Sequence, residues 1–201
     1  MKRTTKFIAL GLLSCSCLTG CFGKTSSKKK SSSKTQVSLS EWKALAEACP
    51  YNEIKTAIAD VDGEFEQADG TKTVVKGKQY FEYSEQNWVL TKDETGNEYF
   101  DSKGYVGMRM DSYATLIESA INAENSYYTF TFYSNMTLDV KIDVKVEEQI
   151  KIKGSGTIRF NSNGFFEYVK MGGNLGGVIY QDGSKITTLN SNYTIDISYF
   201  A

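Results

Sequence analysis

The most regular feature of the chain is an alternation of apolar and polar residues with a period of two. Between residues 136 and 147 ("MTLDVKIDVKVE") every even position is apolar and every odd position is polar. Successive side chains of an extended chain point to opposite faces, so this segment is predicted to be a half-exposed antiparallel strand. The same alternation recurs in residues 128–133 ("YTFTFY") and 193–200 ("YTIDISYF").

Short segments rich in Asp, Asn and Gly separate the predicted strands. These residue types tolerate the positive φ angles of tight turns, and they therefore predict hairpins. The predicted turns are Asp69-Gly70, Thr95-Gly96-Asn97, Asn163-Gly164 and Asp182-Gly183, with residues 93–101 expected to form a hairpin loop. The pattern predicts eight or more strands joined mainly by hairpins.

The alternation continues without a clear break from Leu138 to Ile152, where Glu148 is the one polar residue at an even position. A single strand over residues 137–152 would be about 53 Å long at roughly 3.3 Å per residue, well beyond the usual length. The favoured interpretation is a turn or bulge at residues 147–149. The alternative is a long curved strand on which Glu148 points inward, which is costly for an unpaired carboxylate.

Two segments have helical spacing instead. In residues 37–49 ("VSLSEWKALAEAC") a cap at Ser38 or Ser40 precedes Trp42, Leu45, Ala46 and Cys49, and Pro50 ends the helix. A second helix is predicted in residues 111–124 ("DSYATLIESAINAE"), where Tyr113, Leu116, Ile117 and Ala120 share one face.

The first twenty residues have the pattern of an export signal. Lys2, Arg3 and Lys6 precede a short apolar stretch at residues 7–13, which is too short to cross a bilayer. The stretch leads to Leu18-Thr19-Gly20-Cys21, which resembles the lipobox of bacterial lipoproteins. The resemblance implies a signal peptide at residues 1–20, cleavage between Gly20 and Cys21, and a diacylglycerol group on Cys21. It also implies anchorage of the exported protein at the outer face of the cell membrane, because two acyl chains make a stable anchor.

The cysteines near this signal have two other interpretations. A disulfide among Cys15, Cys17 and Cys21 would need a folded, oxidised context, and a metal site would need a second cysteine cluster or histidines. The chain has no histidine, and Cys49 is its one other cysteine. The lipobox interpretation leaves Cys49 as the thiol of the mature domain, either a buried apolar group or a reactive one.

Residues 21–36 are rich in Lys and Ser and are expected to form a disordered tether. Residues 1–36 hold eight of the 23 basic residues and none of the 24 acidic ones, so residues 37–201 carry a net charge of about −9. The tether either lies against anionic lipid heads or is a solvated spacer. An acidic domain is not suited to nucleic acid, and that partner is not expected.

Residues 37–201 are expected to form one β-rich domain. An opening helix, hairpins, a central helix and further hairpins resemble the fold of LolA-type lipoprotein carriers. The segment "GTIRFNSNGFFEYVKM" (156–171) is similar to a strand-turn-strand of envelope lipoproteins, and the opening helix with its Glu41-Trp42 pair is similar to that of uncharacterised surface lipoproteins of low-GC Gram-positive bacteria. The resemblance implies an α+β fold in which a curved antiparallel sheet, a half-open barrel, is combined with one N-terminal and one central helix.

The residue types argue against catalysis and against a metal or other cofactor. Without histidine, Ser-His-Asp and Cys-His sites are excluded, and the carboxylates mostly alternate with apolar residues, as on a solvated strand face. We therefore expect a non-enzymatic protein.

Aromatic residues make up 13% of the chain, and many of them alternate along the predicted strands. They either fill the core or line an apolar cavity. Alternation with a period of two is expected in both cases, so it does not distinguish them. The candidate cavity residues are Trp42, Tyr128, Phe130, Phe132, Phe160 and Tyr193. A cavity predicts a protein that binds or carries a lipid or another apolar or amphiphilic ligand. A filled core predicts a surface interaction or structural lipoprotein with an unknown protein partner.

Overall fold

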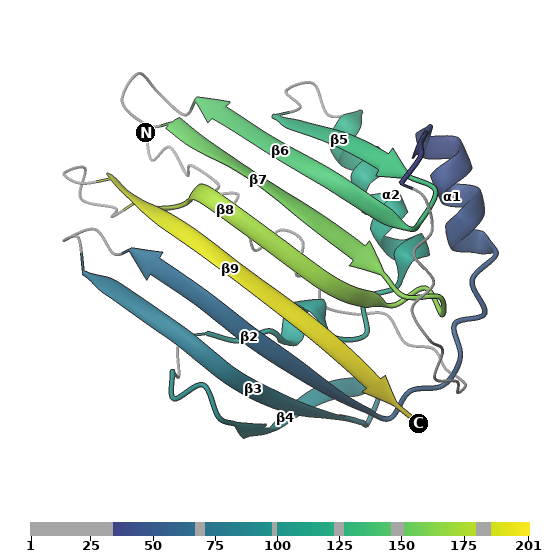
Figure 1. The fold of residues 1–201 in the computed structure, drawn as a ribbon, viewed down its shortest axis with the longest axis horizontal. Helices are drawn as coiled ribbons and strands as arrows, with labels where there is room; N and C mark the ends of the chain where they lie inside the picture. Colours follow the sequence, from purple (N-terminus) through teal and green to yellow (C-terminus); the bar gives the residue numbers. More distant parts are fainter. Residues whose placement is uncertain (1–33, 67–70, 98–99, 123–126, 146–150, 180–185) are drawn as a thin grey trace, which may run out of the picture.

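The computed structural model describes residues 34–66, 71–97, 100–122, 127–145, 151–179 and 186–201. They form a nine-stranded antiparallel sheet with the strand order β1-β5-β6-β7-β8-β9-β2-β3-β4 (Figure 1). The strands are β1 (Gln36–Val37), β2 (Thr56–Glu66), β3 (Lys72–Ser84), β4 (Asn87–Asp93), β5 (Tyr128–Tyr133), β6 (Thr137–Lys145), β7 (Lys151–Phe160), β8 (Phe166–Ile179) and β9 (Ile186–Phe200). Two α-helices, α1 (Leu39–Glu47) and α2 (Met110–Ile121), and a short 3-10 helix, η2 (Lys103–Tyr105), complete the described elements.

The predicted fold class is confirmed, because a curved antiparallel sheet that does not close is combined with one N-terminal and one central helix. Helix α2 and η2 lie behind the sheet in Figure 1, and α1 lies beside the end of the sheet that β1 and β5 form. We call the face that these elements cover the covered face, and the opposite one the open face. On β6, Leu138, Val140 and Ile142 are buried on the covered face, while Lys141 and Asp143, on either side of Ile142, are exposed.

The long alternating segment is divided between two strands. β6 ends at Lys145 and β7 begins at Lys151, and these two residues are antiparallel partners in the sheet. A single continuous strand over residues 137–152 is therefore excluded. Glu148 lies outside the described residues, as do the predicted turns at Asp69-Gly70 and Asp182-Gly183.

Helix α1 begins at Ser38, the first of the two predicted caps. The Ser38 side chain accepts a hydrogen bond from the Glu41 backbone N–H, and the Glu41 carboxylate accepts one from the Ser38 backbone N–H. Together they form a capping box, which satisfies two N–H groups at the start of the helix. Trp42 and Ala46 are the buried residues of this helix.

Helix α2 begins one residue before the predicted segment, at Met110, and its N-cap Arg109 makes no side-chain capping bond. Its buried residues are Met110, Tyr113, Ala114 and Ile117. Tyr113 and Ile117 belong to the predicted face, whereas Leu116 and Ala120 are only half-buried.

The prediction of a hairpin loop at residues 93–101 is wrong. The strand that follows β4 in the chain is β5, and the two lie at opposite sides of the sheet. Asp93 instead ends β4 by accepting hydrogen bonds from the backbone N–H and the hydroxyl of Thr95, at 2.7 and 2.6 Å. The described residues 94–97 and 100–109, which include η2 and lead to α2, lie on the covered face; we call them the crossing segment.

The fold begins slightly earlier than the expected boundary at Val37. β1 starts at Gln36 and pairs with β5, and the Lys34 ammonium lies 3.1 Å from the Asp139 carboxylate and 4.0 Å from the centre of the Tyr133 ring. The last residues of the expected tether, 34–36, therefore pack against the domain.

Candidate functional site

Three of the six candidate cavity residues meet in one buried cluster. The Trp42 ring of α1 lies 5.3 Å from Phe132 of β5 and 5.7 Å from Phe160 of β7, measured between ring centres. All three are at most 6% exposed. The tilted and edge-to-face geometry is favourable for aromatic pairs, so these rings fill the space between α1 and the sheet.

Two residues that sequence reasoning did not select as site residues complete this cluster. Tyr113 of α2 lies 5.7 Å from Phe160 and 5.8 Å from Phe166 of β8, and Phe160 and Phe166 are 5.1 Å apart. Tyr113 was recognised as a residue of the apolar helix face, but nothing in the sequence indicated its partners. Those contacts depend on where α2 lies over the sheet.

The other two candidates of β5 continue the row of rings along the strand. Tyr128, Phe130 and Phe132 stack in series, with ring centres 6.0 and 6.3 Å apart. Tyr128 and Phe130 are half-buried and pack against the core.

Tyr193 lies in a second cluster, under the crossing segment. Its ring stacks on Phe65 of β2 at 5.7 Å and meets Phe100 edge-on at 6.2 Å. Its hydroxyl is 2.9 Å from the hydroxyl of Tyr105 in η2. Desolvation raises the pKa of both hydroxyls above the usual value, so they stay protonated at neutral pH.

Two hydrogen-bond donors in the first cluster have no partner among the described residues. These are the indole N–H of Trp42, on a side chain that is 0% exposed, and the hydroxyl of Tyr113, which is 1% exposed. Desolvation raises the Tyr113 pKa far above its usual value. The two groups are therefore neutral, buried donors within an aromatic cluster, suited to hold a polar atom and not to act as nucleophiles.

Cys49 lies at the end of α1 in a half-buried position. Its thiol donates to the Leu45 carbonyl at 3.3 Å and contacts the Met136 sulfur at 3.8 Å. Desolvation, followed by the negative charge of Asp111, raises the pKa of this thiol. Because the thiolate is the reactive form, this environment is typical of a structural cysteine.

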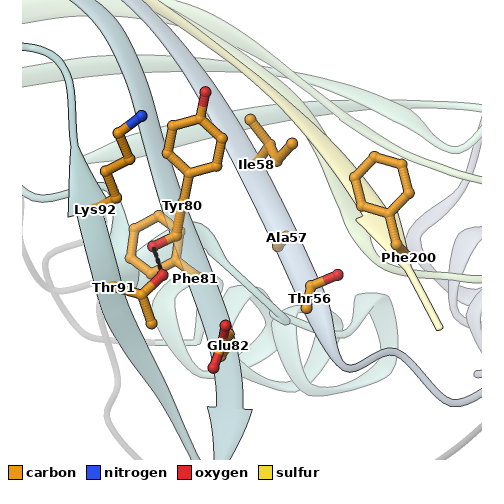
Figure 2. Close-up of a pocket in the computed structure, with 9 residues that line it drawn as sticks. All are labelled: Thr56, Ala57, Ile58, Tyr80, Phe81, Glu82, Thr91, Lys92 and Phe200. Atoms are coloured by element: carbon orange, nitrogen blue, oxygen red, sulfur yellow. Dashed lines mark hydrogen bonds between the residues drawn. The ribbon is translucent and has the colours of Figure 1, made fainter.

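The open face carries a shallow depression at the end of the sheet where β9 finishes. Figure 2 shows its lining from β2, β3, β4 and β9, with the side chains of Ile58, Tyr80 and Phe200 in front of the sheet. We call this depression, of about 310 Å³, the open-face corner; its residues are Thr56, Ala57, Ile58, Tyr80, Phe81, Glu82, Thr91, Lys92 and Phe200. Val89, opposite Glu82 in the sheet, borders it and is 45% exposed, and Phe200 is 49% exposed.

The rest of this part of the open face is mostly charged, although Val74, opposite Glu64, is 63% exposed. Asp62 pairs with Lys76 and Glu64 with Lys72, both at 2.7 Å across β2 and β3. The open-face corner is thus an apolar area at the end of a row of ion pairs. The sequence did not predict it, because its residues come from four strands that are brought together by register.

The remaining predicted site residues, Gly20 and Cys21, lie outside the described residues. In the part of the chain that the structure describes, no three or more His, Cys, Asp or Glu residues are grouped so as to hold a metal ion. No described helix is long and apolar enough to cross a membrane. No protein-family model matches the chain, and no curated protein matches it either.

Proposed function

We propose that the protein is an exported, non-enzymatic lipoprotein, anchored at the outer face of the cell membrane through Cys21, that binds another protein through its open face. The observation that carries the interaction function is the open-face corner. Phe200 and the neighbouring Val89 are exposed there and Ile58 and Tyr80 are half-buried, beside a charged surface, while the aromatic residues of the covered face are engaged with one another. Exposed apolar areas bordered by polar residues are typical of interaction sites.

The sheet order supports this arrangement. The chain enters the domain at β1, one edge of the sheet, and the open-face corner includes residues of β4, the opposite edge. Eight steps between neighbouring strands separate the two edges, or about 38 Å across the sheet at 4.8 Å per step. A tether that leaves from the β1 edge therefore keeps the open-face corner accessible.

The second candidate function is that of a carrier for an apolar or amphiphilic ligand, as the LolA resemblance implies. The partnerless donors of Trp42 and Tyr113 favour it, because a buried donor without a partner costs about 1–3 kcal/mol. A ligand that entered between the helices and the sheet would have to displace rings that contact one another. We therefore place this function second.

The anchor is tested by labelling growing bacteria that express the protein with a radioactive fatty acid. Wild-type protein is expected to incorporate the label and to sediment with membranes. The Cys21→Ser variant is expected to lose the label, and a labelled Cys21→Ser variant would contradict the anchor. Cys49→Ser is the matched control and should be labelled like the wild type.

The interaction function is tested by photo-cross-linking on intact cells, with a photoreactive phenylalanine analogue at position 89. We expect a cross-linked product of one discrete mass that disappears when Ile58→Asp is added. The same analogue at position 115, on the exposed side of α2, is the control and should give no such product. Equal products from both positions, or a product insensitive to Ile58→Asp, would contradict the proposed function.

A further inference from the structure

The open-face corner contains one carboxylate that is free to receive a ligand. Glu82 is exposed, and its carboxylate forms no ion pair or hydrogen bond among the described residues. Farther along the same face of β2, Asp62 and Glu64 each have a lysine partner, whereas the exposed Asp60 between Ile58 and Asp62 forms no ion pair among the described residues. Glu82 is the one of these carboxylates that lines the depression together with the apolar side chains of Ile58 and Phe200.

The sheet register places Glu82 in a row with an aromatic ring. Thr56 is opposite Glu82 on one side and opposite Phe200 on the other. Glu82 and Phe200, on either side of Thr56, are thus about 10 Å apart, which is two strand spacings. The next row brings Ile58 and Tyr80 side by side, so the corner has a carboxylate at one end, a ring at the other and an aliphatic side chain beside them.

The one cation of the corner is already neutralised. The Lys92 ammonium is paired with Glu94 and lies 5.1 Å from the centre of the Tyr80 ring. It is opposite Tyr80, in the second row, and not opposite Glu82. Lys92 therefore does not occupy the position that a ligand of Glu82 would take.

The size and charge of the corner limit what it can bind. A second copy of the chain carries the same net negative charge over residues 37–201, so it is a poor occupant. A volume of about 310 Å³ is enough for one long side chain. The net charge of about −9 over residues 37–201 favours a basic partner.

We infer that the open-face corner binds an arginine side chain of the partner protein, with the guanidinium on the Glu82 carboxylate and the aliphatic part of the side chain against Ile58 and Phe200. A guanidinium pairs with a carboxylate through two parallel hydrogen bonds and is weakly hydrated, which suits a partly apolar site. This inference rests on the proposed function, because it supplies the chemistry by which the partner is recognised.

The test uses the full lipoprotein, purified from membranes in a nonionic detergent, with carbon-13 in its isoleucine methyl groups. The probe is the capped tripeptide Gly-Arg-Gly, and the matched peptide carries citrulline, which has the same shape without the charge. The Ile58 methyl signal reports the corner, and the signal of Ile117, which is 1% exposed, reports the interior. Glu82→Gln removes the charge, and Glu85→Gln removes an exposed charge outside the depression.

We expect the arginine peptide to shift the Ile58 signal saturably and to leave the Ile117 signal unchanged. Its dissociation constant should be at least fivefold lower than that of the citrulline peptide. Glu82→Gln should weaken binding at least fivefold, and Glu85→Gln less than twofold. Equal binding of the two peptides, or equal effects of the two variants, would overturn the inference. If the arginine peptide does not bind while the cross-link from position 89 is still formed, the interaction function stands and the arginine assignment is wrong.

Discussion

The side-chain carbonyl of Gln79 accepts two hydrogen bonds from Ser102, one from its backbone N–H at 2.9 Å and one from its hydroxyl at 2.6 Å. Its amide group donates to the Asp93 carboxylate at 2.9 Å and to the Phe100 carbonyl at 2.8 Å. Gln79 and Ser102 are both 0% exposed. One buried side chain of β3 therefore holds the crossing segment against the sheet, and the segment in turn covers the second aromatic cluster.

Gln79→Leu is expected to lower the free energy of unfolding by about 2–4 kcal/mol. Leucine keeps most of the volume, but it leaves the Ser102 donors and the Asp93 and Phe100 acceptors without their partner. Urea unfolding measures the change. Ser84→Ala, at the exposed end of the same strand, should stay within about 0.5 kcal/mol of the wild type. Equal effects of the two substitutions would contradict the role of Gln79.

Two Tyr→Phe substitutions in the same core should have opposite effects. The Tyr199 hydroxyl donates to the Phe166 carbonyl at 2.7 Å and accepts from the Gly107 N–H at 3.2 Å, so Tyr199→Phe should cost about 1–2 kcal/mol. Tyr113→Phe removes a hydroxyl without a partner and should leave stability unchanged or raise it by up to about 1 kcal/mol. Thermal unfolding measures both. A loss of more than about 1 kcal/mol for Tyr113→Phe would show a bound partner of that hydroxyl and favour the carrier function.

The two serines at the start of α1 should differ in their contribution. Ser38 forms the capping box with Glu41, whereas Ser40 lies inside the helix, 3.0 Å from the Ser38 hydroxyl. We expect Ser38→Ala to lower the unfolding free energy by about 1 kcal/mol and Ser40→Ala by less than half of that. Chemical denaturation of the two variants measures the two unfolding free energies. A larger decrease for Ser40→Ala than for Ser38→Ala would disprove the assigned cap.

Stability should fall steeply at alkaline pH. Desolvation raises the pKa of Tyr51, Tyr105, Tyr113, Tyr193 and Tyr199 above the ordinary value near 10. Below pH 10 these groups are protonated in both the folded and the unfolded chain. Above pH 10 the unfolded chain loses their protons first, so stability falls as the pH rises, by up to about 1.4 kcal/mol per pH unit for each group.

Tyrosinate absorbance and circular dichroism, followed together, measure this effect. We expect part of the thirteen tyrosines to ionise near pH 10 and the rest to ionise only as the fold is lost. Ionisation of all thirteen near pH 10 in a folded protein would contradict the buried positions of these rings.

The turn between β7 and β8 should tolerate no side chain at Gly164. This residue has a φ of +84°, and an added Cβ would lie 2.5 Å from the Tyr51 ring and 2.7 Å from the Cys49 Cβ. Gly164→Ala is expected to cost about 3 kcal/mol through backbone strain and overlap. Gly96→Ala, with a φ of +68° and no neighbour within 4 Å, should cost only about 1 kcal/mol. Equal costs in denaturant unfolding would mean that the turn does not pack on Cys49 and Tyr51.

Local features of the sequence were sufficient to predict the strands at residues 128–133, 136–147 and 193–200, both helices, and a helix cap at Ser38 or Ser40. Period-two alternation and capping chemistry act over a few residues, and they placed Leu138, Val140 and Ile142 on the buried face correctly. The crossing segment could not be predicted in this way. Asp93, Thr95 and Gly96 have the composition of a hairpin turn, and only the buried Gln79 in another strand fixes the chain on the covered face.

The candidate site was predictable in part. Aromatic content and alternation identified Trp42, Phe132 and Phe160, which the structure brings together. The open-face corner was not predictable, because Glu82 and Phe200 are far apart in the sequence and become neighbours of Thr56 only through the register of three strands.

The most direct test of the central claim, a filled aromatic interior with the binding site on the open face, is native mass spectrometry of the full lipoprotein released from membranes in detergent. The expected mass is that of the chain with its own acyl groups and nothing more, and an environment-sensitive apolar dye should not bind the folded protein. A further lipid in stoichiometric amount, lost in the Trp42→Ala variant under conditions where that variant is folded, would contradict the claim and identify the protein as a carrier.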